Sequence, residues 1–119
     1  MWIRPLASFA AVLLLAQATG QAAPLNCTIG PVAKTFAGNT WLVHGCDDDR
    51  TLILVAAPGN PAAPFYFLVY PAPDGRLIVD GEGAVDRRLT AEAAAALARL
   101  SDADIANLIA EAKRQAKHD

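Results

Sequence analysis

The stretch that decides the fold is residues 65–70, which read FYFLVY. Aromatic and β-branched side chains dominate this stretch, and such residues favour the pleated surface of a β-sheet. Successive side chains of a strand point to opposite faces, so Phe65 and Phe67 share one face of the predicted strand. Tyr66 and Tyr70 share the other face. We expect the phenylalanines to form the core beneath a covering layer and the tyrosines to lie on a partly solvated face.

Further strands are predicted on both sides of this stretch. Residues 51–55 (TLILV) form a continuous apolar run, which indicates a central strand with apolar side chains on both faces. Residues 39–46 alternate between apolar and polar side chains, and residues 76–80 form a short fourth strand. A Gly-Pro pair interrupts residues 28–37, which predicts a bent edge strand or a short turn of helix there. Turn residues separate these segments, so we expect consecutive strands to pair as an antiparallel meander.

The C-terminal part of the chain, residues 89–117, predicts helices. Thr90 is a suitable N-cap for a first helix, and Ser101 begins a second capping signal. This pattern favours two helices with a break near residue 100, and one long helix is the alternative. The second helix carries an apolar stripe on one face, formed by Ile105, Leu108, Ile109, Ala112 and Ala116.

An apolar stripe on a helix needs an apolar surface to cover, and the predicted sheet is the one such surface available. The sequence therefore predicts an α+β fold, in which a four- to five-stranded antiparallel meander sheet (27–80) is followed by two C-terminal helices (89–117) packed on one face. We expect the buried helix residues to be Leu97, Leu100, Ile105, Leu108 and Ile109.

The first residues, 1–22, have the pattern of a signal peptide. One arginine precedes an apolar run at residues 6–18, which is too short to span a bilayer as a helix, and small residues follow it. We expect cleavage near Ala22, which leaves a single domain at residues 23–119 in the periplasm or outside the cell. An uncleaved anchor and lipidation at Cys27 are the alternatives, but the asparagine before this cysteine does not suit lipoprotein processing.

Cys27 and Cys46 are the two cysteines of the chain. An even number of cysteines in an exported chain predicts a disulfide bond. Closing a loop of about 20 residues in this way is worth roughly 3 kcal/mol in the chain-entropy estimate. Their spacing offers neither a CxxC motif nor a nearby histidine pair, so we expect no zinc site.

Length and composition exclude several classes of protein. The chain has 119 residues, enough for one domain and not for two. Its formal net charge is −2, and the missing surplus of lysine and arginine excludes a basic nucleic-acid-binding protein. The hydrophobic fraction of 54% excludes a disordered chain. We also exclude a multi-span membrane protein, and we expect no membrane contact once the signal peptide is removed.

No catalytic motif is present in the sequence. It contains no nucleophile elbow, no phosphate-binding glycine loop and no HExxH zinc motif. His44 with one of the nearby acids Asp47, Asp48 and Asp49 is the one acid–base candidate, and a strand histidine without a catalytic role is the favoured interpretation. Three consecutive acids also do not match a calcium-binding loop. We therefore expect no enzyme activity, no metal and no cofactor.

The favoured function is that of a small exported binding or inhibitor-type protein. Alternate loops of a meander share one end of the sheet, so Asp47, Asp48 and Asp49 are expected to gather with Asp74. A disulfide at Cys46 would hold this acidic loop, which would suit a basic protein partner, for example a wall-degrading or toxic enzyme.

Two further functions and a second part of the partner surface remain open. Tyr66 and Tyr70 are expected to add to the partner surface, because exposed tyrosines suit protein contacts. The alternative functions are a carrier of a small apolar ligand between the sheet and the helices, and a small hydrolase that uses His44. The sequence leaves the oligomeric state undetermined.

Overall fold

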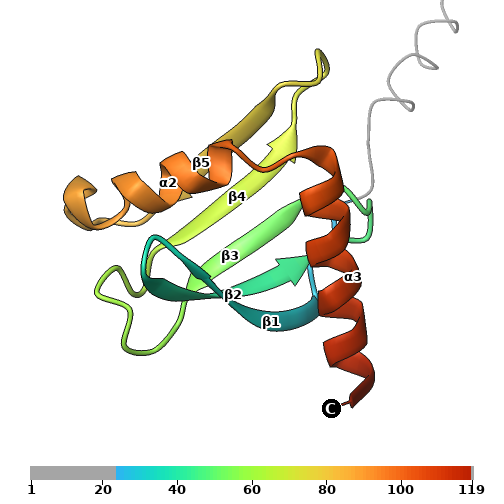
Figure 1. The fold of residues 1–119 in the computed structure, drawn as a ribbon, viewed down its shortest axis with the longest axis horizontal. Coiled ribbons are helices and arrows are strands. Elements are labelled where there is room, and N and C mark those ends of the chain that lie inside the picture. The colour runs from blue at the N-terminus through green and yellow to red at the C-terminus, as the bar shows by residue number, and fades with distance from the viewer. Residues whose placement is uncertain (1–23, 119) are drawn as a thin grey trace, which may run out of the picture.

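Five strands pair in sequence order to form one antiparallel sheet (Figure 1). The structure is a computed structural model that describes residues 24–118, so the predicted signal peptide lies outside the described residues. The predicted meander is confirmed, and its strands are β1 (Ile29–Phe36), β2 (Asn39–Gly45), β3 (Leu52–Ala56), β4 (Tyr66–Pro71) and β5 (Leu77–Glu82).

The first strand is a bent edge strand, one of the two forms expected from the Gly-Pro pair. The pairing of β1 with β2 shifts register between Ile29 and Val32. Gly30 between them has a φ of 105°, and a Cβ atom on it would lie 3.1 Å from the Cβ of Ala112 and 2.9 Å from the backbone oxygen of Val43. A glycine is therefore needed here, because it lets the edge strand lie tight against the C-terminal helix.

The last strand is longer than the sequence predicted. We expected the sheet to end near residue 80, yet Asp80, Gly81 and Glu82 continue β5 and pair with β4. The ring of Phe65 lies where a side chain on Gly81 would stand. This glycine is thus a close-packing position inside a strand and not a sheet terminator.

Two helices follow the sheet, α2 (Ala91–Ala98) and α3 (Asp102–His118), preceded by a 3-10 turn, η2 (Arg87–Leu89). They are separate helices because a reciprocal cap begins α3. The amide of Asp104 donates to Oγ of Ser101 at 3.0 Å, and the amide of Ser101 donates to Oδ2 of Asp104 at 2.8 Å. The predicted second capping signal is confirmed, and it satisfies amide groups that a helix start leaves unpaired.

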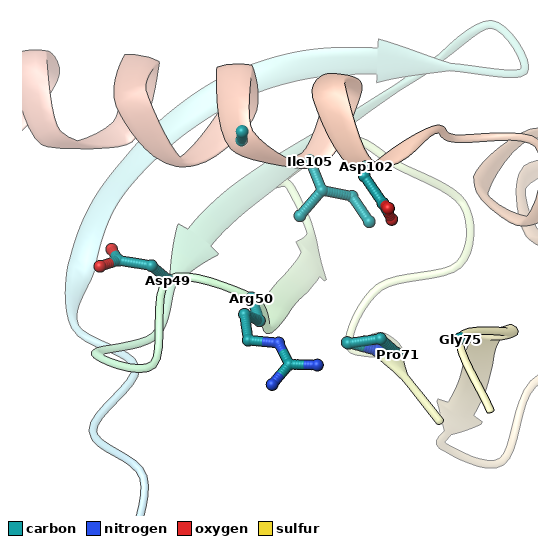
Figure 2. A pocket seen from close by; sticks show the side chains of 7 residues that line it. Asp49, Arg50, Pro71, Gly75, Asp102 and Ile105 are labelled. Atoms are coloured by element: carbon teal, nitrogen blue, oxygen red, sulfur yellow. The ribbon is translucent and has the colours of Figure 1, made fainter. Parts of the chain in front are cut away.

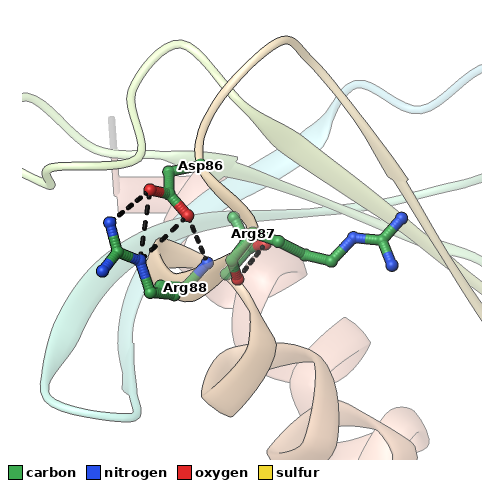
Figure 3. Close-up of polar contacts among 4 residues, drawn as sticks. Asp86, Arg87 and Arg88 are labelled. Carbon is green, nitrogen blue, oxygen red and sulfur yellow. Dashed lines mark hydrogen bonds and ion pairs between the residues drawn. The ribbon is translucent and has the colours of Figure 1, made fainter.

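The start of α2 differs from the expectation. Thr90 occupies the N-cap position, but its hydroxyl donates to the backbone oxygen of Arg87 at 3.3 Å and does not cap the helix. The preceding 3-10 turn presents that oxygen to it. The turn itself is closed by Asp86, which accepts from the amide of Arg88 and forms an ion pair with its guanidinium at 2.7 Å (Figure 3).

Both helices lie on the same side of the sheet, with α2 beside β5 and α3 across β1 and β2 (Figure 1). Their buried residues form one core with alternate residues of the strands. The two aromatic rings at its centre, Trp41 and Phe67, lie 5.1 Å apart between centroids. The buried members of this core are Trp41, Val43, Leu52, Leu54, Ala56, Ala62, Phe65, Phe67, Val69, Ala93, Leu97, Ile105, Leu108 and Ile109.

The predicted core is confirmed with two exceptions. Leu100 is half-buried, because it lies in the connection between the helices. Ala116, expected on the buried stripe, is exposed because the last turns of α3 extend past the edge of the sheet (Figure 1).

The opposite side of the sheet has no helix over it within residues 24–118. We call this side the open face. Its side chains alternate with those of the core, so every strand contributes at least two of them. They are Ala33 and Thr35 from β1, Thr40, Leu42 and His44 from β2, Ile53 and Val55 from β3, Tyr66, Leu68 and Tyr70 from β4, and Ile78, Asp80 and Glu82 from β5.

Candidate functional site

Two turns and the start of α3 meet at one end of the sheet, which we call the loop end (residues 46–51 and 71–76). The two turns and α3 line a common hollow of about 260 Å³, in which Figure 2 shows Arg50 between Asp49 and Pro71. A second hollow on the other side of Arg50 reaches Tyr70 and the exposed Leu25. The structure thus brings the two predicted acidic turns together at this end.

The turn after β2 is held at its base by the disulfide. Cys27 and Cys46 are joined by an S–S bond of 2.04 Å, as predicted, and Cys46 is completely buried. The neighbouring backbone reinforces this link. The amide of Asp47 donates to the backbone oxygen of Asn26 at 2.9 Å, and the amide of Asn26 donates to Oδ1 of Asp47 at 3.2 Å. The N-terminal segment is therefore fixed to the turn both covalently and through hydrogen bonds.

Asp48 organises the turn from within. Its carboxylate accepts from the amides of Arg50 and Thr51 at 3.0 and 2.9 Å, and from the Thr51 hydroxyl at 2.6 Å. Burial works to raise the pKa of Asp48, but the hydrogen bonds from Thr51 and Arg50 outweigh it and leave the pKa below its ordinary value. Asp48 is thus a structural residue of the loop, which local side-chain hydrogen bonding in Asx turns explains.

The other acids of the loop end have basic neighbours. Asp49 accepts from Nζ of Lys113 at 2.8 Å, and Asp74 accepts from Nε of Arg76 at 2.9 Å. The hydrogen bonds from the amide and then the guanidinium of Arg76 hold the pKa of Asp74 below its ordinary value. With Arg50 beside them, the four acids share their end of the molecule with three basic side chains. The loop end is therefore mixed in charge, where the sequence had predicted an acidic rim.

Sequence reasoning missed Lys113 because it lies 64 residues from Asp49 in the chain. Only the way in which α3 crosses the sheet brings it to the loop end. Arg76 gave a clearer signal, since an acid and an arginine two residues apart in a Gly-containing turn can pair locally.

The open face is apolar in its middle and polar at its sides. Strand register aligns His44, Ile53, Leu68 and Asp80 in one row across β2 to β5, and Leu42, Val55, Tyr66 and Glu82 in the next. In each row the two central side chains are aliphatic or aromatic. The carboxylates lie on β5 alone, while β2 carries the histidine.

The predicted tyrosines lie on this open face. Tyr66 is 39% exposed, and Tyr70 is half-buried. The hydroxyl of Tyr70 donates to Oδ2 of Asp80 at 3.1 Å. This hydrogen bond, with burial and the charge of Asp80, raises the pKa of Tyr70. The two tyrosines therefore occupy different surroundings, since Tyr70 adjoins the loop end and Tyr66 lies toward the opposite end of β4.

His44 has no acid beside it in the described part of the chain. Its strand neighbour on the open face is Ile53, and the three consecutive aspartates lie in the turn beyond β2. Burial lowers the pKa of His44, which leaves the imidazole neutral near pH 7. The acid–base pair considered from the sequence is not brought together by the fold.

Residues 24–118 contain neither a cluster of metal-ligating side chains nor a membrane-spanning helix. Within them no three His, Cys, Asp or Glu side chains are grouped to hold a metal ion. None of the helices described there is both long and apolar enough to cross a membrane. Between the sheet and the helices, Leu54 and Leu97 are both fully buried and Trp41 almost so, and these side chains fill the space in which an apolar ligand was considered.

No family model, curated protein or solved structure is found that matches this chain.

Proposed function

We propose that this chain is a small exported binding protein of the inhibitor type, without catalytic activity, which presents its loop end to a protein partner. The observation that carries the proposal is the way the 46–51 turn is held. A disulfide, a reciprocal pair of hydrogen bonds to Asn26 and the three hydrogen bonds to Asp48 fix its backbone, while the outer side chains stay exposed. A loop fixed before binding loses less conformational entropy when a partner engages it.

Export is supported by the disulfide together with the signal-peptide pattern of residues 1–22. A disulfide persists in oxidising compartments such as the periplasm or the extracellular space. Cys46 is buried at the base of the loop, so the oxidised form is also the form in which the loop is held.

A partner with basic side chains suits this end best. The Asp49–Lys113 and Asp74–Arg76 pairs are both exposed, and exposed pairs of this kind contribute little, about 0–1 kcal/mol, so a partner's arginine can compete for these carboxylates. The hollow beside Arg50 and Pro71 offers a shape for a protruding side chain. Because the local charge is mixed, we expect only a moderate dependence of association on salt.

The proposal is tested by site-specific photo-crosslinking in cells that export the protein. A photoreactive residue in place of Asp47 should capture a distinct partner protein. The same residue in place of Glu92, which is exposed on α2 away from the loop end, serves as the matched control. Capture from both positions, or from neither, would contradict a binding site at the loop end.

With the captured partner in hand, the carboxylates can be examined directly. The triple variant Asp47→Asn, Asp49→Asn, Asp74→Asn keeps Asp48 and hence the turn. Its association rate at low salt should fall by about tenfold. Glu92→Gln should leave this rate unchanged. An unaltered rate in the triple variant would show that the partner does not use the acids.

A further inference from the structure

The open face presents an unusual amount of apolar surface for the solvated side of a sheet. Antiparallel sheets that face water on one side carry polar residues there. Here the middle of that side is built from Ile53, Val55 and Leu68, with Leu42, Ile78 and Tyr66 around them. The aliphatic residues are half-buried, and Tyr66 is 39% exposed. Contiguous apolar patches of this kind mark association sites.

The polar groups on this face are arranged so that one copy complements another. In the row His44–Ile53–Leu68–Asp80, the imidazole stands at the β2 side and the carboxylate at the β5 side. A two-fold axis that runs parallel to the strands, between β3 and β4, places this row on the same row of a second copy in reverse order. Ile53 of each copy then lies against Leu68 of the other copy, and His44 of each copy lies against Asp80 of the other.

We propose that two copies of this chain pack open face to open face in a two-fold symmetric dimer, in which His44 of each copy lies against Asp80 of the other.

The four strands that face each other in this arrangement, β2 to β5, set the size of the interface. Strands spaced about 4.8 Å apart, with about six residues at about 3.3 Å each, give these four strands an area on the order of 400 Å². Two such faces bury on the order of 800 Å² in total, which is the size of a weak, transient interface. Packed sheets cross at about 30°. His44 and Asp80 each lie about 7 Å from the two-fold axis. At that distance the crossing angle displaces a strand of one copy from the facing strand of the other by about 4 Å, which the side chains of His44 and Asp80 can span.

The charges of the open face favour a second copy over a membrane. An interfacial protein surface surrounds its apolar residues with lysine and arginine, which attract anionic lipids. The charged groups of the open face are instead the carboxylates Asp80 and Glu82. A second copy brings its own imidazole to one of these carboxylates.

The dimer is also expected to take up protons when it forms. Around His44 within its own copy, β1 contributes no titratable group and β3 contributes Ile53, so burial alone acts on the imidazole. In the dimer, Asp80 of the second copy favours the protonated form. Association should therefore tighten as the pH falls below neutrality.

This interface is independent of the proposed partner site, because it uses the opposite side of the sheet from α3 and leaves the loop end free. The axis runs along the strands, so both loop ends lie at the same end of the dimer. A partner with two suitable sites would then be bound with increased avidity. A protein that stays monomeric would not contradict partner capture at Asp47. Absence of capture at Asp47 would likewise not contradict the dimer.

The experiment is sedimentation equilibrium of the exported protein from about 1 µM to about 1 mM, a range that spans weak to moderate dimers. We expect a monomer–dimer equilibrium that shifts toward dimer between pH 7.5 and pH 5.5. Val55→Glu, at the centre of the open face, should raise the dissociation constant by at least about 100-fold, because it buries unpaired carboxylates. Ala95→Glu on the exposed side of α2 should not alter it.

A charge exchange keeps the test valid if Val55→Glu fails to fold. His44→Asp places two carboxylates together in the dimer and should raise the dissociation constant about tenfold or more. Adding Asp80→His to it should restore association. The two positions are about 14 Å apart within one copy, so this rescue cannot arise inside the monomer. A monomer at every concentration, or a dimer that ignores both Val55→Glu and the charge exchange, would overturn the proposal.

Discussion

Leu54 and Val55 are consecutive residues of the central strand, and they show how differently the two faces of the sheet are used. Leu54 has no exposed surface and lies under the helices, whereas Val55 is half-buried on the open face. The two side chains differ little in hydrophobicity. The difference between them lies in what covers each face. The hydrophobic energy of the covered face stabilises the monomer, and that of the open face remains free for association.

The largest expected effect comes from truncating the covered face. Leu54→Ala should lower the free energy of unfolding by about 2–5 kcal/mol, through lost burial and the cavity left behind. Val55→Ala, measured where the monomer predominates, should cost about 1 kcal/mol or less. Denaturant titration followed by the fluorescence of Trp41, which is the one tryptophan of residues 23–119, measures both. Equal losses in the two variants would mean that the open face is also part of the folded core.

Much of this arrangement could be predicted from the sequence, because it depends on local patterns. Alternation and turn residues define the strands and their order, the cysteine pair predicts the disulfide, and Ser101 marks the break between the helices. The assignment of Phe67 to the core and of Tyr66 to the other face also follows from alternation alone. These features need no knowledge of which distant residues meet.

What could not be predicted depends on distant contacts. The pairing of Lys113 with Asp49 requires the path of α3, and it changes an acidic rim into a mixed one. The extension of β5 through Gly81 depends on the ring of Phe65 lying over that glycine. The apolar run at residues 51–55 predicts a strand apolar on both faces, but only the placement of the helices shows that one of these faces stays open.

A smaller loss in the free energy of unfolding is expected at the loop end, because hydrogen bonds rather than buried apolar side chains stabilise the 46–51 turn. Asp48→Asn should cost about 1 kcal/mol at pH 7, by analogy with the loss of a capping carboxylate. The pKa of Asp48 is lowered in the folded protein, so its contribution is present above the ordinary value of 3.8 and is lost as the pH falls through the folded pKa. The wild type should therefore lose part of its advantage over the variant below about pH 4, as thermal melts across pH would show.

An asparagine at this position still donates and accepts hydrogen bonds, so the comparison isolates the charge. Asp47→Asn is the matched control in the same turn, because its carboxylate accepts a single amide hydrogen bond at 3.2 Å. A stability difference between the wild type and Asp48→Asn that does not change with pH would show that the ionised carboxylate does not organise the turn.

The different use of the two faces can be measured in the unmodified protein by hydroxyl-radical footprinting at low and high protein concentration. Tyr66 on the open face is 39% exposed, and Leu89, which lies in the 3-10 turn η2 and not on that face, is 42% exposed. If the open face is the association surface, oxidation of Tyr66 will slow as the protein concentration rises, while oxidation of Leu89 will not. An oxidation rate of Tyr66 that is independent of concentration would contradict this division of the sheet into a folding face and a binding face.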